Sequence, residues 1–263
     1  MTFIVGITCQ DGLVVASEQL ESDGITKRYR QKIHSRVIGD EWGVLWAGTG
    51  PSYVVDKFSD KFAELVGNGD FDRAKLELHA EMCLQFIRKQ YSRPSDAIDI
   101  VMAIFGTPML KEKGKTFPGL PEFHLYRGGS ESACIAEQRD YCCAGMDCTL
   151  AVFALDAFVN PFGCVAEACQ VAFIVTSLMK KYAEGCGGKV DCFYYQFGKP
   201  HWTPLLDSQL ATLKSDFPVT DVEKAMTEFW AEHPKNVIMK AKTEAEIQMR
   251  RVTRSQKKNK RTK

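Results

Sequence analysis

The sequence predicts an α+β protein, a four-layer αββα sandwich in which two antiparallel sheets are flanked by helices. Three observations support this fold class: β-rich hairpins precede the first helix, groups of strands are separated by pairs of helices, and no regular strand–helix–strand alternation runs through the chain. Runs of strands separated from runs of helices favour antiparallel sheets with helices on their outer faces.

Two hairpins are expected at the start of the chain. Residues 3–9 and 13–17 are rich in β-branched side chains and flank Gln10-Asp11-Gly12, whose Asp-Gly step favours a tight turn with positive φ. Residues 32–38 and 44–46 flank a second turn that contains glycine at both ends. We therefore expect four strands, arranged as two hairpins of one sheet, before the first helix.

Two helices should follow these hairpins. Gly50-Pro51 indicates a helix start with proline at the first helical position, and a second helix is expected over about residues 71–92, ending at Arg93-Pro94. Each segment has one apolar stripe at helical spacing. The stripes are Val54, Phe58, Phe62 and Leu65 in the first helix, and Leu76, Ala80, Cys83, Leu84 and Ile87 in the second.

The rest of the chain continues the pattern of grouped elements. Strands are expected near 98–105, 122–126, 133–136, 141–143 and 190–197, and helices at 147–158 and 163–183. We assign residues 1–200 to one domain and 201–247 to an extension with a helix that packs on it. The amphipathic pattern of that helix comes from Val222, Ala225, Met226, Phe229 and Trp230.

The last segment, 248–263, is predicted to be a basic, flexible tail. Residues 250–263 carry eight Lys or Arg and no acid, and the total charge of +1 leaves −7 on residues 1–249. Such a segment lacks the apolar residues needed to pack. A solvated end is favoured over a nucleic-acid arm, because the acidic body supplies no basic groove or aromatic platform.

Composition places the chain among soluble proteins, since 45% of its residues are hydrophobic and 25% are charged, and no run of 18 apolar residues occurs. No signal peptide is visible, so we expect a cytoplasmic protein with no membrane partner. Ten cysteines lie within apolar runs without a Cys-x-x-Cys pair, and five histidines stand at unpatterned spacings. Buried thiols, with no metal and no cofactor, are the expectation.

Thr2 directly follows the first methionine. A small residue at this position is common because it permits methionine removal, so Thr2 alone indicates little. If Met1 is removed, however, the hydroxyl of Thr2 can act as a nucleophile with its own α-amine as the base, because the unperturbed pKa of an α-amine is about 7.7–8.0. No histidine is then needed, and neither a histidine triad signature nor Gly-x-Ser-x-Gly is present.

Three further residues can complete such a site. Lys32 can stabilise the alkoxide, Glu18 can orient Lys32, and Gly48 in Ala47-Gly48-Thr49-Gly50 can offer a main-chain N–H to an oxyanion. Glu18 closes the second expected strand and Lys32 opens the third, so both can lie at the end of the sheet where residue 2 lies. Taken singly, they are equally consistent with a surface ion pair and a glycine turn.

The stretches 2–7, 11–18, 32–33 and 47–50, with the helix after them, resemble the N-terminal half of a proteasome β-type subunit. These subunits belong to the superfamily of N-terminal nucleophile hydrolases, which includes the bacterial HslV and Anbu peptidases. The resemblance covers about residues 2–66 and continues weakly to about 197. It implies the αββα fold, threonine chemistry and ring-like homo-oligomers.

The resemblance implies that Thr2 is the nucleophile, Lys32 the family lysine and Gly48 the oxyanion glycine, while Glu18 stands where the family usually has aspartate. Two family features are missing: Cys143-Ala144-Gly145 lacks the serine of the family's Gly-Ser-Gly segment, and residues 183–188 lack its aspartate and serine. The candidates to replace them are Asp147, Glu184 and Cys186.

The sequence thus predicts a threonine-type amide hydrolase that acts on a peptide or protein substrate through a Thr2 acyl-enzyme. Two alternatives stay open: acyl transfer by the same site, as in a transpeptidase or ligase-like enzyme, and a ring subunit without catalysis. The apolar stripes of the two helices at 54–66 and 76–87, together with the ring assembly of the family, lead us to expect a homo-oligomer.

Overall fold

The computed structural model describes residues 2–22, 27–38, 42–67, 72–112, 115–145, 148–183, 186–199 and 201–216, together with Lys224 and Glu228. The chain separates into two compact units, 1–219 and 220–263. In the second unit, Lys224 and Glu228 are helical and their charged groups lie 3.9 Å apart. The rest of the amphipathic helix predicted there, and the basic tail, lie outside the described residues, so the extension and tail stay predictions.

The first sheet is antiparallel and has the strand order β12-β1-β2-β13-β14. Its strands are β1 (Phe3–Cys9), β2 (Gly12–Glu18), β12 (Tyr141–Gly145), β13 (Val190–Gln196) and β14 (Thr203–Pro204). The predicted first hairpin is present, with Cys9 opposite Gly12. Its turn does not use positive φ; instead, Gly12 is needed because a Cβ there would lie 1.9 Å from the carbonyl oxygen of Tyr195.

The second sheet is also antiparallel, with the order β11-β10-β7-β6-β5. Its strands are β5 (Ile33–Ile38), β6 (Trp42–Thr49), β7 (Asp99–Gly106), β10 (Glu122–Gly129) and β11 (Cys134–Gln138). The expectation that both N-terminal hairpins belong to one sheet is therefore wrong. The chain leaves the first sheet after β2, forms a small hairpin of β3 (Leu20–Ser22) and β4 (Lys27–Tyr29), and enters the second sheet at β5.

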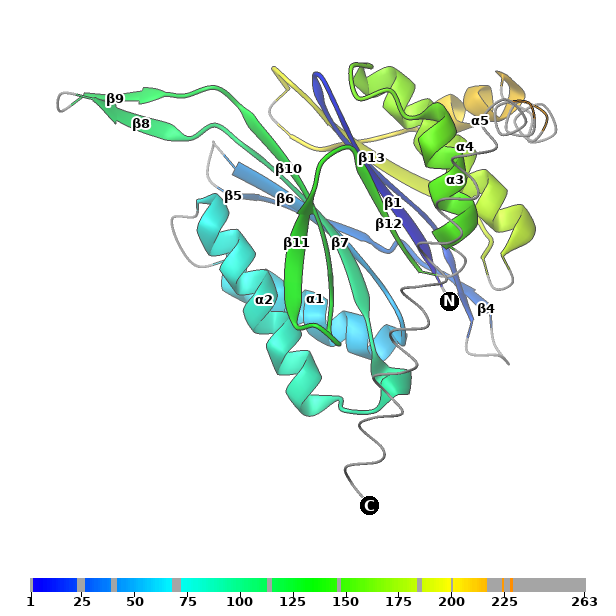
Figure 1. Ribbon diagram of the computed structural model, residues 1–263, viewed down its shortest axis with the longest axis horizontal. Coiled ribbons are helices and arrows are strands. Elements are labelled where there is room, and N and C mark those ends of the chain that lie inside the picture. The colour runs from blue at the N-terminus through cyan, green and yellow to red at the C-terminus, as the bar shows by residue number, and fades with distance from the viewer. Residues whose placement is uncertain are drawn as a thin grey trace. The chain divides into compact units, whose positions relative to one another are not determined.

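Helices cover the outer faces of both sheets, as the predicted αββα layering requires. The helices are α1 (Ser52–Val66), α2 (Arg73–Gln90), α3 (Cys148–Phe158), α4 (Val165–Tyr182) and α5 (Asp207–Asp216), with a short 3₁₀ turn η1 at Pro94–Asp96. Figure 1 shows α1 and α2 on one side of the strands and α3 and α4 on the other. Pro51 is the N-cap of α1, so this helix begins at Ser52, one residue later than predicted. The carboxylate of Asp72 caps α2 by accepting the N–H of Lys75 at 2.9 Å.

Apolar cores hold the layers together. One lies between the sheets and includes Ile4, Val15 and Leu45, and another lies between the second sheet and α1–α2. The apolar stripes predicted for α1 and α2 belong to this second core, so their own sheet covers them and they are not available to neighbouring subunits. A different stripe of α2 is exposed: Leu78 at 55%, Met82 at 47% and Phe86 at 39%.

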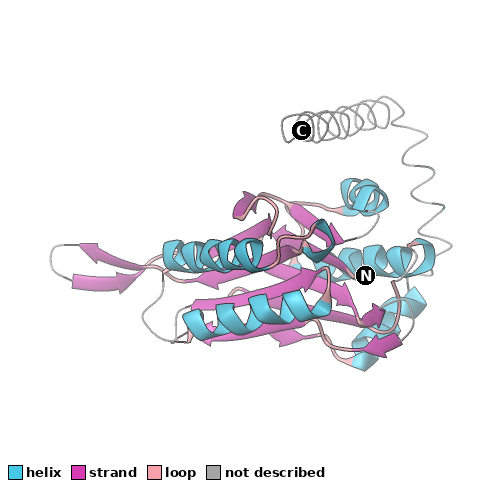
Figure 2. Cartoon of the chain, turned by 90° about the horizontal axis from the view of Figure 1, so that it is seen from below, coloured by secondary structure: helices cyan, strands magenta, loops and turns pink. Residues whose placement is uncertain are grey.

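Several short elements have no counterpart in the predicted order. They are β3–β4, β14, α5 and a hairpin of β8 (Met109–Glu112) and β9 (Lys115–Pro118). The β8–β9 hairpin prolongs the connection between β7 and β10 and extends away from the sheet (Figures 1 and 2). No helix in the described part of the chain is long and apolar enough to cross a membrane.

The burial of the cysteines gives a direct test of the fold. Seven of the ten are buried, whereas Cys134 and Cys164 are exposed. Burial raises the pKa of the Cys83 thiol to about 12, so little thiolate forms there near neutral pH. We predict that a thiol reagent at pH 8 modifies Cys134 and Cys164 first and Cys83 only after unfolding. Peptide mapping by mass spectrometry checks this, and early labelling of Cys83 in the folded protein would contradict the packing of α2.

Candidate active site

Thr2 and Lys32 meet between the two sheets, at one end. Thr2 immediately precedes β1 and is only 6% exposed, and Lys32 immediately precedes β5. The Nζ of Lys32 donates to Thr2 Oγ1 at 2.7 Å, to Glu18 Oε1 at 2.9 Å and to the carbonyl oxygen of Leu20. These three bonds match the three N–H groups of an ammonium. The geometry therefore places the positively charged ammonium of Lys32 beside the hydroxyl of Thr2.

Glu18 is the anchor of this cluster. Its side chain is fully buried, yet each carboxylate oxygen accepts two hydrogen bonds. Oε1 accepts from Lys32 Nζ at 2.9 Å and from the N–H of Phe3 at 3.2 Å, and Oε2 accepts from the N–H groups of Leu20 at 2.6 Å and Gly187 at 3.2 Å. Four donors of this kind compensate for the loss of hydration of a buried carboxylate. Glu18 therefore fixes both Lys32 and the residue next to Thr2.

Gly48 lies close to the same place, near the end of β6. A Cβ on Gly48 would lie 2.7 Å from Cγ1 of Val55, so glycine is also needed there for the packing of α1. The next residue, Thr49, donates its hydroxyl to the carbonyl oxygen of Thr2 at 3.1 Å, a contact that the sequence did not suggest. This end of β6 thus borders Thr2, while the oxyanion role of Gly48 stays a prediction.

The segment that lacks the family serine borders Thr2 as well. In β12, Gly145 is opposite Phe3 and has a φ of +113°, and a Cβ on it would lie 1.9 Å from the carbonyl oxygen of Thr2. Ala144 is buried in the core between the sheets. A side chain at residue 145 would displace Thr2, so this segment supports the site through its main chain.

Of the three candidate replacements for the missing side chains, the structure describes one. Asp147 and Glu184 lie outside the described residues. Cys186 is buried and precedes Gly187, whose N–H binds Glu18. The structure thus places the Cys186 segment beside the cluster.

Two residues that the sequence did not single out lie beside the cluster. Asp191 in β13 is opposite Ser17, the residue before Glu18, and accepts from Nε2 of Gln19 at 2.8 Å. Burial raises the pKa of Asp191, and the bond from Gln19 and the charge of Lys32 oppose that rise. No local motif could reveal this contact, because Gln19 and Asp191 are 172 residues apart in the chain.

A groove of about 790 Å³ lies next to the cluster, between α4, α5 and the start of β13. Its lining is apolar at Phe173, Val190 and Leu210 and basic at Lys180, Lys189 and Lys214. The pKa of Lys180 is lowered by burial and by the charge of Lys214, and the charge of Glu18 opposes this shift. Val190, which lines the groove, is paired with Glu18 across β13 and β2, so the groove adjoins the candidate site.

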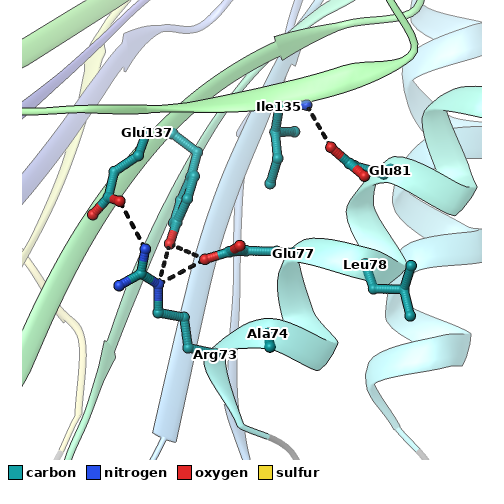
Figure 3. A pocket seen from close by; sticks show the side chains of 8 residues that line it. Arg73, Ala74, Glu77, Leu78, Glu81, Ile135 and Glu137 are labelled. Carbon is teal, nitrogen blue, oxygen red and sulfur yellow. Dashed lines mark hydrogen bonds and ion pairs between the residues drawn. The ribbon is translucent and has the colours of Figure 1, made fainter.

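A second pocket, of about 260 Å³, lies between α2 and the strands β10 and β11 (Figure 3). Arg73 donates there to Glu77 Oε1 at 2.6 Å, to the hydroxyl of Tyr126 at 2.8 Å and to Glu137 Oε2 at 2.7 Å. Burial opposes the charge of Arg73, but its bonds to Glu77 and Tyr126 and the charge of Glu137 raise its pKa above the ordinary value. Tyr126 belongs to the core under α1 and α2, so this network ties α2 to the sheet on the side away from Thr2.

Comparison with known proteins supports the fold. No family model matches the sequence, and no curated protein matches it. A mutant of Anbu from Hyphomicrobium sp. strain MC1 superposes with a TM-score of 0.67 at 12% identity, over 88% of this chain and 97% of that chain. Anbu from Yersinia bercovieri, described as an ancestral beta-subunit, has a TM-score of 0.65 at 11% identity, over 90% of this chain and 97% of its own.

A third solved structure is a helical assembly of the Anbu complex from Pseudomonas aeruginosa. Its subunit has a TM-score of 0.64 at 11% identity and covers 90% of this chain and 96% of that chain. The α+β sandwich described above is therefore the fold of the proteasome-like N-terminal nucleophile hydrolases, as the resemblance in residues 2–66 implied.

The buried ion pair leads to a stability prediction. Glu18→Ala leaves the ammonium of Lys32 and three main-chain N–H groups without their acceptor, and breaking a buried pair costs about 3–5 kcal/mol. We expect a loss of that size in the free energy of unfolding, measured with urea. The control is Glu64→Ala, since Glu64 is 66% exposed and its pair with Lys61 is a surface pair. An equal loss in both variants would contradict the anchoring role of Glu18.

Proposed function

We propose that this chain, which has the proteasome-like N-terminal nucleophile hydrolase fold, is a threonine-type amide hydrolase that cleaves peptide bonds. The observation that carries the proposal is the contact of 2.7 Å between Lys32 Nζ and Thr2 Oγ1, with Glu18 holding the lysine from its other side at 2.9 Å. A hydroxyl oxygen with a fixed ammonium beside it suits a nucleophile, because the ammonium stabilises the negative charge that develops on attack.

The reaction begins with removal of the residue before Thr2, which exposes the α-amine. The amine takes the proton of Thr2 Oγ1, and the oxygen attacks the carbonyl carbon of the substrate to form a tetrahedral oxyanion. Main-chain N–H groups near Gly48 are the proposed donors to that oxyanion. The amine then protonates the leaving nitrogen as the peptide bond breaks, and an ester of Thr2 remains. Water attacks this ester, and Oγ1 regains a proton as the new carboxylic acid leaves.

Lys32 has the role of an electrostatic partner and not that of the base. All three of its N–H groups donate in the cluster, one of them to Glu18. An ammonium in this state has no lone pair to accept a proton. The base is therefore the α-amine of Thr2, and the site needs a chain that starts at Thr2.

Acyl transfer by the same site is the second candidate. The ester of Thr2 is common to both reactions, and an amine in place of water would give a new peptide bond. The basic groove beside Glu18 could hold such a second substrate, although it would equally suit part of a peptide being cleaved. Product analysis with and without an added amine separates hydrolysis from transfer.

The nucleophile is tested by mass and turnover together. We expect the intact mass of the active protein to correspond to a chain that begins at Thr2, and Thr2→Ala to abolish cleavage of a fluorogenic peptide mixture while the melting temperature is kept. Lys32→Ala should be nearly as damaging to turnover. Lys57→Ala, on the exposed face of α1, is the matched control and should keep full turnover. Retained Met1 in an active preparation would overturn the proposed mechanism.

We also propose that the chain forms a homo-oligomer, with a ring as the first arrangement to test. The structural neighbour from Pseudomonas aeruginosa forms a helical assembly. In this chain the exposed side chains Leu78, Met82 and Phe86 recur at helical spacing on α2 and give an apolar stripe that a neighbouring subunit could cover.

Light scattering tests the assembly. We expect a particle several times larger than the 29.5 kDa chain, and we expect the double variant Leu78→Lys, Phe86→Lys to be smaller, because lysines on this stripe oppose apolar packing. The control Lys57→Ala should leave the particle size unchanged. A wild-type mass of one chain at working concentration would refute the oligomer, and an unchanged size of the double variant would exclude the α2 stripe as the contact.

A further inference from the structure

We infer that Thr49 is a positioning residue, whose hydroxyl holds the carbonyl group of Thr2 and so fixes the orientation of the nucleophile. The consequence for turnover rests on the proposed function of Thr2. The contact itself belongs to the fold, with 3.1 Å between Thr49 Oγ1 and the carbonyl oxygen of Thr2. The role of Thr49 and the function of Thr2 can therefore be tested separately.

The peptide group between Thr2 and Phe3 is held from both sheets. Its N–H, which belongs to Phe3, donates to Oε1 of Glu18 at 3.2 Å, and Glu18 lies in β2 of the first sheet. Its carbonyl oxygen, which belongs to Thr2, accepts the hydroxyl of Thr49 from β6 of the second sheet. A peptide group is planar, so bonds on its two opposite edges fix the whole plane. One of these bonds alone would leave the plane free to tilt.

The main chain that carries the Thr49 hydroxyl is itself fixed. Thr49 is the buried last residue of β6 and is paired with Asp99 in β7. The next residue, Gly50, has a φ of +130°, and a Cβ on it would lie 2.6 Å from the carbonyl oxygen of Ala97. Only glycine adopts this conformation readily, so the turn after Thr49 is confined as well. A hydroxyl on such a rigid element suits a positioning role.

The orientation of residue 2 matters because removal of Met1 leaves Thr2 with one peptide bond to the rest of the chain. Lys32 restrains the side chain of Thr2 through the bond of 2.7 Å from Nζ to Oγ1. A tilt of the peptide plane would carry Oγ1 away from this ammonium, and misplacement of a reacting group by about 1 Å can cost about 100-fold in rate. Thr49 and Lys32 thus act on different groups of the same residue, one on the carbonyl and one on the nucleophilic oxygen.

Thr176 provides a matched comparison for the bond of Thr49. A buried hydroxyl needs a hydrogen-bond partner wherever it lies, so part of the effect of removing one is structural. Thr176 is buried in α4, and its hydroxyl donates to the carbonyl oxygen of Ala172 at 2.7 Å within the same helix. The same substitution at both positions therefore separates a loss of stability from a loss of positioning.

Two variants of Thr49 test the hydroxyl directly. Thr49→Val removes the donor and keeps the branched shape, whereas Thr49→Ser keeps the donor. We expect Thr49→Val to lower kcat about tenfold with little change in KM, because the nucleophile is misplaced while the substrate contacts are kept. Thr49→Ser should keep most of kcat, and the control Thr176→Val should keep full kcat. If Thr49→Val does not fold, Thr49→Ala removes the same donor and takes its place.

Three outcomes of the kinetics would overturn the inference. If Thr49→Val keeps full kcat, the bond to Thr2 has no effect on the site. If Thr49→Ser is as damaged as Thr49→Val while both have the melting temperature of the wild type, the hydroxyl is not responsible. If Thr176→Val loses as much kcat as Thr49→Val, the effect is one of stability and not of positioning.

Crystal structures of the wild type, Thr49→Val and Thr49→Ser give a readout that needs no turnover. We expect Thr2 Oγ1 to lie beyond hydrogen-bond distance of Lys32 Nζ in Thr49→Val, compared with 2.7 Å in the wild type, and to stay in place in Thr49→Ser. An unmoved Oγ1 in Thr49→Val would overturn the inference even if the enzyme is active. A displaced Oγ1 in a protein without any peptidase activity would support the inference while the proposed function fails.

Discussion

The buried carboxylate of Glu18 is the interaction on which the candidate site depends. It is fully buried and takes hydrogen bonds from an ammonium and from three main-chain N–H groups of different segments. The first strand, the turn after β2, the start of β5 and the segment before β13 all meet at this one group. Because a buried charge is stable only with such partners, the position of each segment is tied to the others.

This constraint explains why the site lies between the two sheets and at one end of them. Thr2 comes from the first sheet and Lys32 from the entry to the second, so neither sheet alone brings the hydroxyl and the ammonium together. The apolar core between the sheets sets their separation, and the polar cluster closes that core at its end. Packing and chemistry are thus coupled: a change that separates the sheets also separates the two groups.

Much of the fold was predictable from local pattern, and part of the site was not. The β-rich composition of residues 3–9 indicated the correct strand, which is buried on both faces. The stripe at Leu76, Ala80 and Cys83 indicated both the helix and its buried face, because burial repeats with the period of the helix. Pairing partners leave no such signal. The register of Ala47 with Val101 in the second sheet, and the contact of Gly187 with Glu18 across 169 residues, depend on long-range packing. The N-terminal motifs and the resemblance indicated Thr2, Lys32 and Glu18, whereas no motif singled out Asp191.

The place of Thr2 in the sheet has a practical consequence for anyone who produces the protein. β1 lies between β12 and β2, and the carbonyl oxygen of Thr2 is enclosed by Thr49 and Gly145. A purification tag fused in front of Thr2 would have to leave the sheet through this enclosed end, and its peptide bond would turn the α-amine into an amide. An affinity label therefore belongs at the other terminus, or behind a protease site whose cleavage leaves Thr2 as the first residue.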